Sequence, residues 1–285
     1  MEFLVNKRSL LIIAMALMAA ACNKSQLITS SESVDMRFNE SMEWNKKHPM
    51  REIFVKSDDY SILAAADCHV GSTANLDEFL KRAGNENPAA VIVDGDLTGG
   101  LSEDYDTFEN HIINNDSINL FYVVGNHDLW YNGWGEFYSR FGSSSYYFTI
   151  TTPVASDLYI CLDTGGTTIG HLQMEWLKNL LKTMRPEYRR CVIITHINLF
   201  RPRKTTSTNL VEEELDALIN LFTEHNVDMV ITGHDHVRDA EEFGVTTYIQ
   251  VDALKDGLSN AGYMNLKVKN GKIGYNFLSI SEYCC

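Results

Sequence analysis

Short runs of consecutive apolar residues alternate along the chain with segments in which apolar residues recur every three or four positions. The runs span residues 62–66, 89–93, 120–124, 158–162, 191–195 and 228–232. Because most are apolar at successive rather than alternate positions, they are typical of central strands covered on both faces. The segments between them predict helices over residues 76–83, 102–113, 171–183 and 211–225. This alternation predicts an α/β fold with right-handed crossovers.

The C-terminal part of the chain has a different pattern. Three strand-like segments, 245–251, 263–268 and 273–280, follow one another without a helical segment between them, and Asn270-Gly271 is a hairpin signal. No internal repeat and no second domain boundary are evident, so residues 58–285 are expected to form a single domain.

The N-terminus has the order of features found in a secretion signal. Lys7 and Arg8 precede an apolar run of twelve residues, 10–21. The run is shorter than the roughly 18 residues that a membrane span needs, which favours a signal peptide over residues 1–21. A buried N-terminal helix is the alternative interpretation.

The small residues directly before Cys22 resemble a bacterial lipobox, although Ala19 stands where such motifs usually have Leu. The resemblance implies cleavage after Ala21, lipid on Cys22, and an exported protein anchored to the bacterial cell envelope. Residues 22–57 are polar and are expected to form the lipid-anchored tether, with one short helix around residues 37–47.

Composition narrows the function classes. The chain has 285 residues, 45% hydrophobic content and a formal net charge of −14, which is typical of a globular protein and excludes disorder. The acidic balance argues against nucleic-acid binding, which requires a basic surface to neutralise phosphates. The six cysteines form no CxxC pair, and Cys161 and Cys191 lie in strand-like runs, where we expect them to be buried as small hydrophobes.

Five of the apolar runs end in polar loops that contain metal-ligating residue types. The loops are Asp67-Cys68-His69, Asp94-Gly95-Asp96, Gly125-Asn126-His127-Asp128, His196, and Gly233-His234-Asp235-His236. Ligands bind at the carboxyl ends of strands in open α/β sheets. Since neighbouring strands lie about 4.8 Å apart, five such loops can converge on one small volume.

The spacing and chemistry of these residues predict a metal centre. In an extended segment, residues two apart point the same way. Asp67 and His69 can therefore reach one site together, and so can His234 and His236. The residues between them, Cys68 and Asp235, point away from that site. Imidazole, carboxylate and amide ligands without thiolate suit Mn, Fe or Zn. The candidates exceed what one tetrahedral ion needs, which favours two metal ions with a bridging carboxylate. The structural alternative, polar strand ends without a metal, requires a partner for every buried polar group.

These motifs, in this order from about residue 60 to 236, resemble those of the calcineurin-like metallophosphoesterase superfamily. The resemblance implies a four-layer α/β/β/α sandwich of two mixed β-sheets flanked by helices, with two divalent or trivalent metal ions at the strand ends. It also implies a role for each matching residue. Asp67, His69 and His236 would bind one metal; Asn126, His196 and His234 the other; Asp96 would bridge them; and His127 would be the catalytic acid, oriented by Asp128 or Asp67.

The resemblance implies hydrolysis of a small phosphorylated substrate by a metal-bridging hydroxide. Gly95-Asp96-Leu97-Thr98-Gly99 lacks the second acid that the family often has, and there is no Tyr at position 99. No Arg follows Asn126-His127-Asp128 closely, which favours the broader phosphodiesterase-like branch. The residues do not decide between phosphodiesterase and phosphomonoesterase action. A non-catalytic metal-bearing module that binds phosphorylated ligands is the alternative function, and the net charge makes a nuclease a weaker one.

Two further features lie near the expected site. Residues 129–148 contain nine aromatic residues, which indicates either a local core under a long loop or a wall that contacts substrate; Trp130 and Tyr131 are the best candidates for substrate contact. Arg201, Arg203 and Lys204 follow His196 and are either substrate contacts or solvated surface residues.

Overall fold

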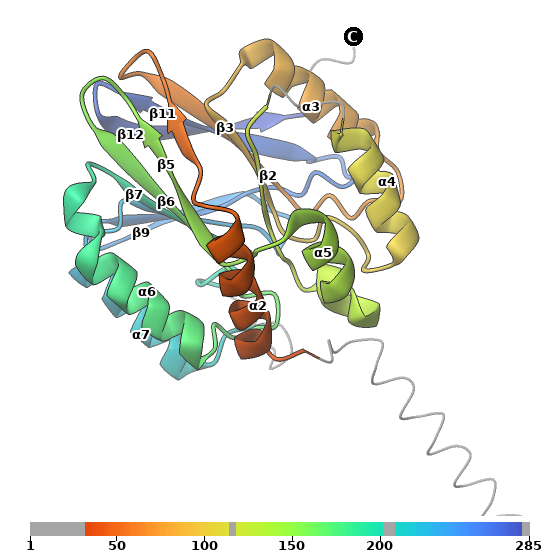
Figure 1. Ribbon diagram of the computed structural model, residues 1–285. Helices are drawn as coiled ribbons and strands as arrows, with labels where there is room; N and C mark the ends of the chain where they lie inside the picture. Colours follow the sequence, from red (N-terminus) through yellow and green to blue (C-terminus); the bar gives the residue numbers. More distant parts are fainter. Residues whose placement is uncertain (1–31, 114–117, 202–208, 281–285) are drawn as a thin grey trace, which may run out of the picture.

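The computed structural model describes residues 32–113, 118–201 and 209–280. In these residues two β-sheets pack face to face and helices cover their outer faces, as Figure 1 shows. The fold is therefore the predicted four-layer α/β/β/α sandwich. No described helix has the length and apolar character needed to cross a membrane.

The elements follow one another in the order implied by the alternating pattern. The strands are β1 (Glu52–Phe54), β2 (Tyr60–Ala66), β3 (Ala90–Asp94), β4 (Leu120–Val123), β5 (Tyr146–Thr151), β6 (Ser156–Leu162), β7 (Cys191–Thr195), β8 (Met229–Thr232), β9 (Asp239–Phe243), β10 (Thr246–Gln250), β11 (Gly262–Lys269) and β12 (Lys272–Ser279). The helices are α2 (Val34–Lys47), α3 (Ala74–Glu86), α4 (Ser102–Ile112), α5 (Trp134–Phe141), α6 (His171–Thr183) and α7 (Glu212–Glu224), with short 3₁₀ segments η1 (His127–Asn132) and η2 (Arg185–Glu187).

The strand order brings the carboxyl ends of the parallel strands to one edge. One sheet has the order β1-β5-β6-β7-β8-β10-β9 and the other β12-β11-β2-β3-β4. Strands β2, β3 and β4 are parallel to one another, and so are β6, β7, β8 and β10. An isolated parallel bridge between Ala66, at the end of β2, and Ala253, after β10, joins the two sheets at this edge. The loops that follow β2, β3, β4, β7 and β8 are thereby brought together.

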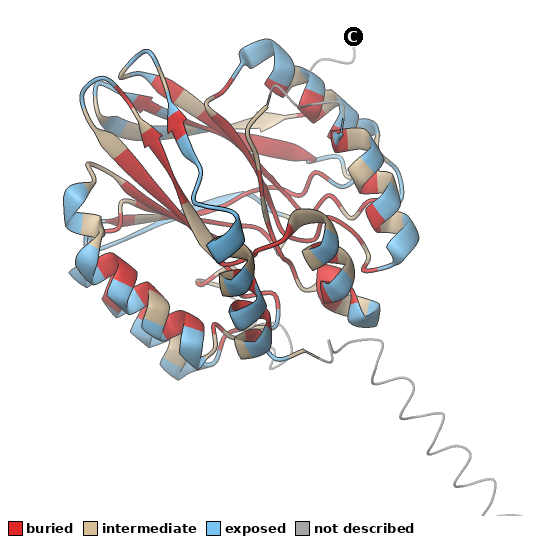
Figure 2. Cartoon of the chain, viewed as in Figure 1, coloured by how far each residue is buried: buried red, intermediate tan, exposed pale blue. Residues whose placement is uncertain are grey.

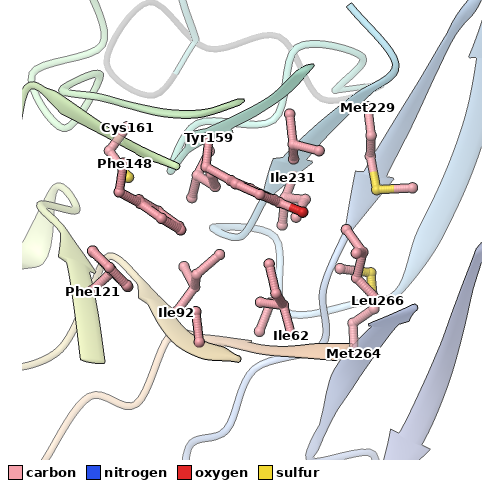
Figure 3. Close-up of a cluster of buried hydrophobic side chains, with 14 of the residues drawn as sticks. Ile62, Ile92, Phe121, Phe148, Tyr159, Cys161, Met229, Ile231, Met264 and Leu266 are labelled. Carbon is pink, nitrogen blue, oxygen red and sulfur yellow. The ribbon is translucent and has the colours of Figure 1, made fainter. Parts of the chain in front are cut away.

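The inner core lies between the two sheets. Figure 3 shows Ile62 and Ile92 of one sheet facing Tyr159 and Ile231 of the other. Alternate residues of the same strands, such as Leu63 on β2, point outward and pack under the helices. The two-sided burial explains why these strands are apolar at successive positions.

The helices cover the outer faces as amphipathic elements. Helices α3, α4 and α5 pack on the five-stranded sheet, whereas α6 and α7 pack on the seven-stranded sheet. Figure 2 shows buried residues on the inward sides of these helices and exposed residues on their outward sides. Cys161 and Cys191 are buried and free, as is Cys68, which confirms the expectation for the first two. Cys284 and Cys285 lie outside the described residues.

The aromatic-rich segment is not the long loop that the sequence indicated. It contains α5 and β5, whose aromatic side chains are mostly packing residues: Trp134 and Phe137 are buried under α4 and the five-stranded sheet, and Phe148 lies between the sheets. The stacked rings of Phe121 and Phe148, with centroids 3.7 Å apart, pack the edge strand β4 of one sheet against β5 of the other. The high local density of aromatic residues therefore reflects core packing, but it does not predict helix α5 or strand β5.

The described part of the expected tether belongs to the folded domain instead. Arg37 on α2 is only 2% exposed, and its Nε lies 2.7 Å from Asp163 Oδ2, at the end of β6. Strand β1 pairs in parallel with β5. A buried ion pair and an added edge strand hold this polar segment, and neither interaction has a hydrophobic period that a sequence reveals. The expected signal peptide and Cys22 lie outside the described residues.

Candidate metal centre

The five polar loops converge as predicted. Asp67 and His69 follow β2, Asp96 follows β3, and the remaining candidates follow β4, β7 and β8. Their ligand atoms form three overlapping groups, each with all atoms within 4.8 Å of one another: Asp67, His69 and His236; Asp96, His196 and His234; and His69, Asp96 and His127.

Asp96 lies between the two halves of this cluster. Its Oδ2 is 3.4 Å from His196 Nε2 and 3.6 Å from His69 Nε2. Asp67 Oδ1 is 3.3 Å from His236 Nε2 and 3.8 Å from His69 Nε2. One half of the cluster therefore contains the Asp67 carboxylate, and the Asp96 carboxylate reaches both halves.

Each carboxylate divides its two oxygens between the backbone and the cluster. Asp67 Oδ2 accepts a hydrogen bond from the backbone N–H of His234 at 2.7 Å, and Asp96 Oδ1 accepts one from that of His127 at 2.7 Å. The second oxygen of each is directed toward the imidazole nitrogens. His196 is oriented in a similar way, since its Nδ1 contacts the Asp94 carbonyl at 3.0 Å and leaves Nε2 for the cluster.

Several buried atoms of the cluster have no hydrogen-bond partner among the described residues. They are Asp67 Oδ1, Asn126 Oδ1, His196 Nε2 and His234 Nε2. Buried polar atoms are nearly always paired, because an unpaired one costs about 1–3 kcal/mol. Four such atoms of metal-ligating type at one site fit a pair of cations.

The electrostatics of the cluster also favour bound cations. Burial lowers the pKa of His69 to about 4 and that of His234 to about 3, so both imidazoles are neutral at pH 7 with a lone pair available. Burial opposes protonation of His196 as well, yet the nearby Asp96 and Asp67 carboxylates raise its pKa well above the ordinary value. The carboxylates thus concentrate negative charge that divalent cations would neutralise.

The backbone at the site is strained, and this differs from the expectation. Asp67, His69, Asp96, His234 and His236 all have φ between +43° and +77°, in the left-handed region. The pairs two residues apart therefore reach the cluster through tight turns and not through an extended segment. Left-handed backbone at residues other than glycine costs roughly 1–3 kcal/mol each and gathers at functional sites.

The residues between the ligands turn away from the cluster as predicted. Cys68 is buried in the core beneath α3. Asp235 Oδ1 lies 2.6 Å from Arg201 Nε. This ion pair holds the Arg201 guanidinium, which is 8% exposed, beside the loop that carries His234. Arg201 thus lies close to the cluster, while Arg203 and Lys204 lie outside the described residues.

Asp128 does not orient His127 in the way expected. Its buried carboxylate accepts hydrogen bonds from the backbone N–H groups of Gly125 at 2.9 Å, Thr98 at 2.9 Å and Leu97 at 3.2 Å. In the described part of the chain it makes no hydrogen bond to the His127 ring. Burial and the nearby Asp96 carboxylate raise the pKa of Asp128 to about 7. Asp128 therefore ties the loop after β3 to the loop after β4.

His127 borders the cluster on its open side. Its side chain is 29% exposed, and its Nε2 lies 3.9 Å from Asp96 Oδ2. The Trp130 ring packs on the imidazole with centroids 3.7 Å apart, and Tyr131 is 46% exposed next to it. Trp130 is thus at the edge of the cluster, and Tyr131 follows it in the chain as an exposed residue.

Asp94 is a site residue that the sequence did not single out as a ligand. It is fully buried at the end of β3, both of its carboxylate oxygens lack partners among the described residues, and burial raises its pKa to about 8. The available signal was its position: Ala90, Ile92 and Asp94 alternate onto the inner face of the sheet, where a carboxyl group is unusual.

Comparison with known families gives the site its context. The family described as calcineurin-like phosphoesterase matches residues 60–238, which contain the whole cluster. The chain belongs to the calcineurin-like phosphoesterase family. It is accordingly a metal-dependent hydrolase of phosphoesters, in a family that typically binds two divalent metal ions. No curated protein matches the chain in sequence.

Solved structures share the calcineurin-like fold at low sequence identity. A dimetal phosphatase from Danio rerio has a TM-score of 0.64 at 14% identity, covering 78% of this chain and 97% of its own. GAP50, described as the anchor in the inner membrane complex of Plasmodium, has a TM-score of 0.62 at 14% identity, covering 79% and 85%. The purple acid phosphatase PPD1 from yellow lupin has 0.60 at 13% identity, covering 80% of this chain but 52% of its own. These likenesses show the fold.

Gly95 provides a test of how tightly the loops meet. It has a φ of +70°, and a Cβ there would lie 2.3 Å from His196 Nδ1. We expect Gly95→Ala to lower the free energy of unfolding by about 1–3 kcal/mol, because the imidazole must move. The matched control is Gly84→Ala on α3, where nothing lies within 4 Å of the new Cβ and stability should rise by about 0.5–1 kcal/mol. Urea unfolding of both variants measures the difference; equal effects would show that the loops do not meet this closely.

Proposed function

We propose that the protein hydrolyses a small phosphodiester, with the ligand set divided between two metal ions. Asp67, His69 and His236 would hold one ion; Asn126, His196 and His234 would hold the other; and Asp96 would be shared between them. The observation that carries the proposal is the division of the Asp67 and Asp96 oxygens between backbone and cluster, together with the unpaired ligand atoms around them. When bound, two such ions supply a hydroxide nucleophile near neutral pH and offset charge on the phosphoryl oxygens.

The charges beside the cluster favour a diester over a monoester. A monoester carries close to two negative charges at pH 7, since its second pKa is about 6, whereas a diester carries one. Arg201, beside the loop that carries His234, is paired with Asp235. Among the described residues, the site therefore offers little cationic charge beyond the metals for a second phosphoryl charge.

We assign His127 the role of general acid. Its backbone is fixed by the hydrogen bond to Asp96, and its ring by Trp130. Burial lowers the pKa of His127, so its imidazolium releases the proton readily to a leaving oxygen. Trp130, which packs on the His127 ring, and the exposed Tyr131 that follows it in the chain are our candidates for an apolar surface that the leaving group contacts.

The test uses two diesters that differ in their leaving groups. With Mn²⁺, we expect turnover of bis(4-nitrophenyl) phosphate and of diphenyl phosphate, with a higher kcat/KM for the first than for the monoester 4-nitrophenyl phosphate. His127→Ala should lose about 100-fold or more on diphenyl phosphate, whose leaving group needs a proton, and much less on the nitrophenyl diester. The control is His171→Ala, at an exposed position on α6.

Three outcomes would contradict parts of this proposal. No turnover with Mn²⁺, Fe²⁺ or Zn²⁺ would favour a non-catalytic module that binds phosphorylated ligands. Equal losses of His127→Ala on both diesters, accompanied by loss of bound Mn²⁺, would make His127 a ligand and not an acid. A monoester preference would overturn the charge argument alone.

We further propose that the enzyme acts at the cell envelope, anchored by lipid on Cys22. The support is the sequence alone: a basic start, a twelve-residue apolar run and small residues before the cysteine. In a bacterial host, Cys22→Ala should move the protein from the membrane fraction to the soluble fraction, whereas Ser25→Ala should leave it with the membrane. Fractionation and immunoblotting measure this, and a Cys22→Ala variant that stays with the membrane would refute the anchor.

A further inference from the structure

A cavity of about 420 Å³ lies between α2, β4, β5 and α5. None of its described lining residues belongs to the metal cluster. We propose that this cavity binds a small apolar monocarboxylate, at a site separate from the hydrolytic centre. Its volume lies in the range of pockets for small molecules, about 300–1,000 Å³.

The walls of the cavity are aromatic and held in place. Tyr122 of β4 and Phe141 at the end of α5 pack with ring centroids 4.6 Å apart, and Trp44 of α2 stacks on His48 at 3.9 Å. Met42, Met50 and Trp176 contribute further apolar lining. Rings fixed by their neighbours form a surface that exists before a ligand arrives, which lowers the entropic cost of binding.

The edge of β4 excludes an extended peptide as the occupant. The Tyr146 hydroxyl donates to the Tyr122 carbonyl at 2.8 Å and accepts from the Tyr122 N–H at 3.0 Å. Arg51 Nη1 donates to the Leu120 carbonyl at 3.0 Å. Because side chains already satisfy these backbone groups, a peptide cannot add here as a further strand.

Arg51 gives the cavity its charge preference. Its guanidinium donates to the Leu120 carbonyl and to Asn119 Oδ1 and lies 4.6 Å from the centre of the Phe121 ring. All three partners are neutral, and in the described residues no carboxylate lies within 4.0 Å of it. The guanidinium has five N–H donors, and two of them are used in these hydrogen bonds, so three remain for a ligand.

The other cation at the cavity, Arg140, is more than neutralised, because it forms ion pairs with three carboxylates, those of Asp106, Glu109 and Glu136. These carboxylates are 36–62% exposed, so water screens their excess charge. One unmatched positive charge fits one negative charge, and the planar guanidinium fits a carboxylate. The aromatic walls alone would suit a quaternary ammonium ion, but the positive charge of Arg51 at the same cavity disfavours a cation.

The test compares three ligands that have the same alkyl chain and different polar head groups. Calorimetry on the Mn²⁺-loaded protein should show one octanoate bound per chain, binding of octanol at least tenfold weaker, and no binding of octylammonium. Octanoate should bind equally after a chelator removes Mn²⁺, and it should not inhibit hydrolysis of bis(4-nitrophenyl) phosphate. Octanol binding as tightly as octanoate, or a preference for octylammonium, would overturn the proposal. So would loss of octanoate binding without Mn²⁺, which would place the carboxylate on the metals.

Two variants locate the binding in this cavity. Arg51→Gln, at an exposed position, should weaken octanoate at least tenfold and leave octanol unchanged; Met42→Trp, which fills the cavity, should abolish both. The matched control is Lys267→Gln, exposed on β11 in the five-stranded sheet, which should bind octanoate like the wild type. Thermal unfolding checks that each variant is folded. Wild-type affinity in a folded Arg51→Gln or Met42→Trp variant would overturn the assignment.

Discussion

Asp67 and Asp96 impose the main constraint on this protein, since each buried carboxylate has one oxygen bound to a backbone N–H and the other facing imidazole nitrogens. Two carboxylates in a buried cluster repel each other and lose their hydration. The backbone bonds compensate only one oxygen of each. Cations at the other oxygens would neutralise the remaining charge, so metal binding is expected to add to the stability of the folded chain.

The rest of the fold brings the Asp67 and Asp96 carboxylates together and holds their side chains in fixed orientations. Parallel strands in both sheets end at one edge, the bridge between Ala66 and Ala253 joins the sheets there, and Asp128 ties neighbouring loops through their backbone N–H groups. Left-handed turns at five of the site residues are held by this framework. The strain is tolerable because the inner core and the two helix layers fix both ends of every loop.

Much of this was predictable because its signals are local. Two-sided burial gives the apolar runs their character, so β2, β7 and α6 lie within a residue or two of the predicted ranges, and polar residues at the strand ends indicate the cluster. The missed parts depend on contacts between distant residues. Arg37 docks α2 through Asp163, 126 positions away, and the role of Asp128 comes from N–H groups of another loop. The left-handed turns were missed because spacing alone does not report φ.

The number of Mn²⁺ ions that each chain binds is a direct test of whether the cluster is a site for two cations. Chelator-treated protein is titrated with Mn²⁺ in a calorimeter, and the metal that remains after gel filtration is measured by elemental analysis. We expect two Mn²⁺ per chain in the wild type. A folded wild-type chain that retains one Mn²⁺ or none would show that the cluster is not a two-cation site.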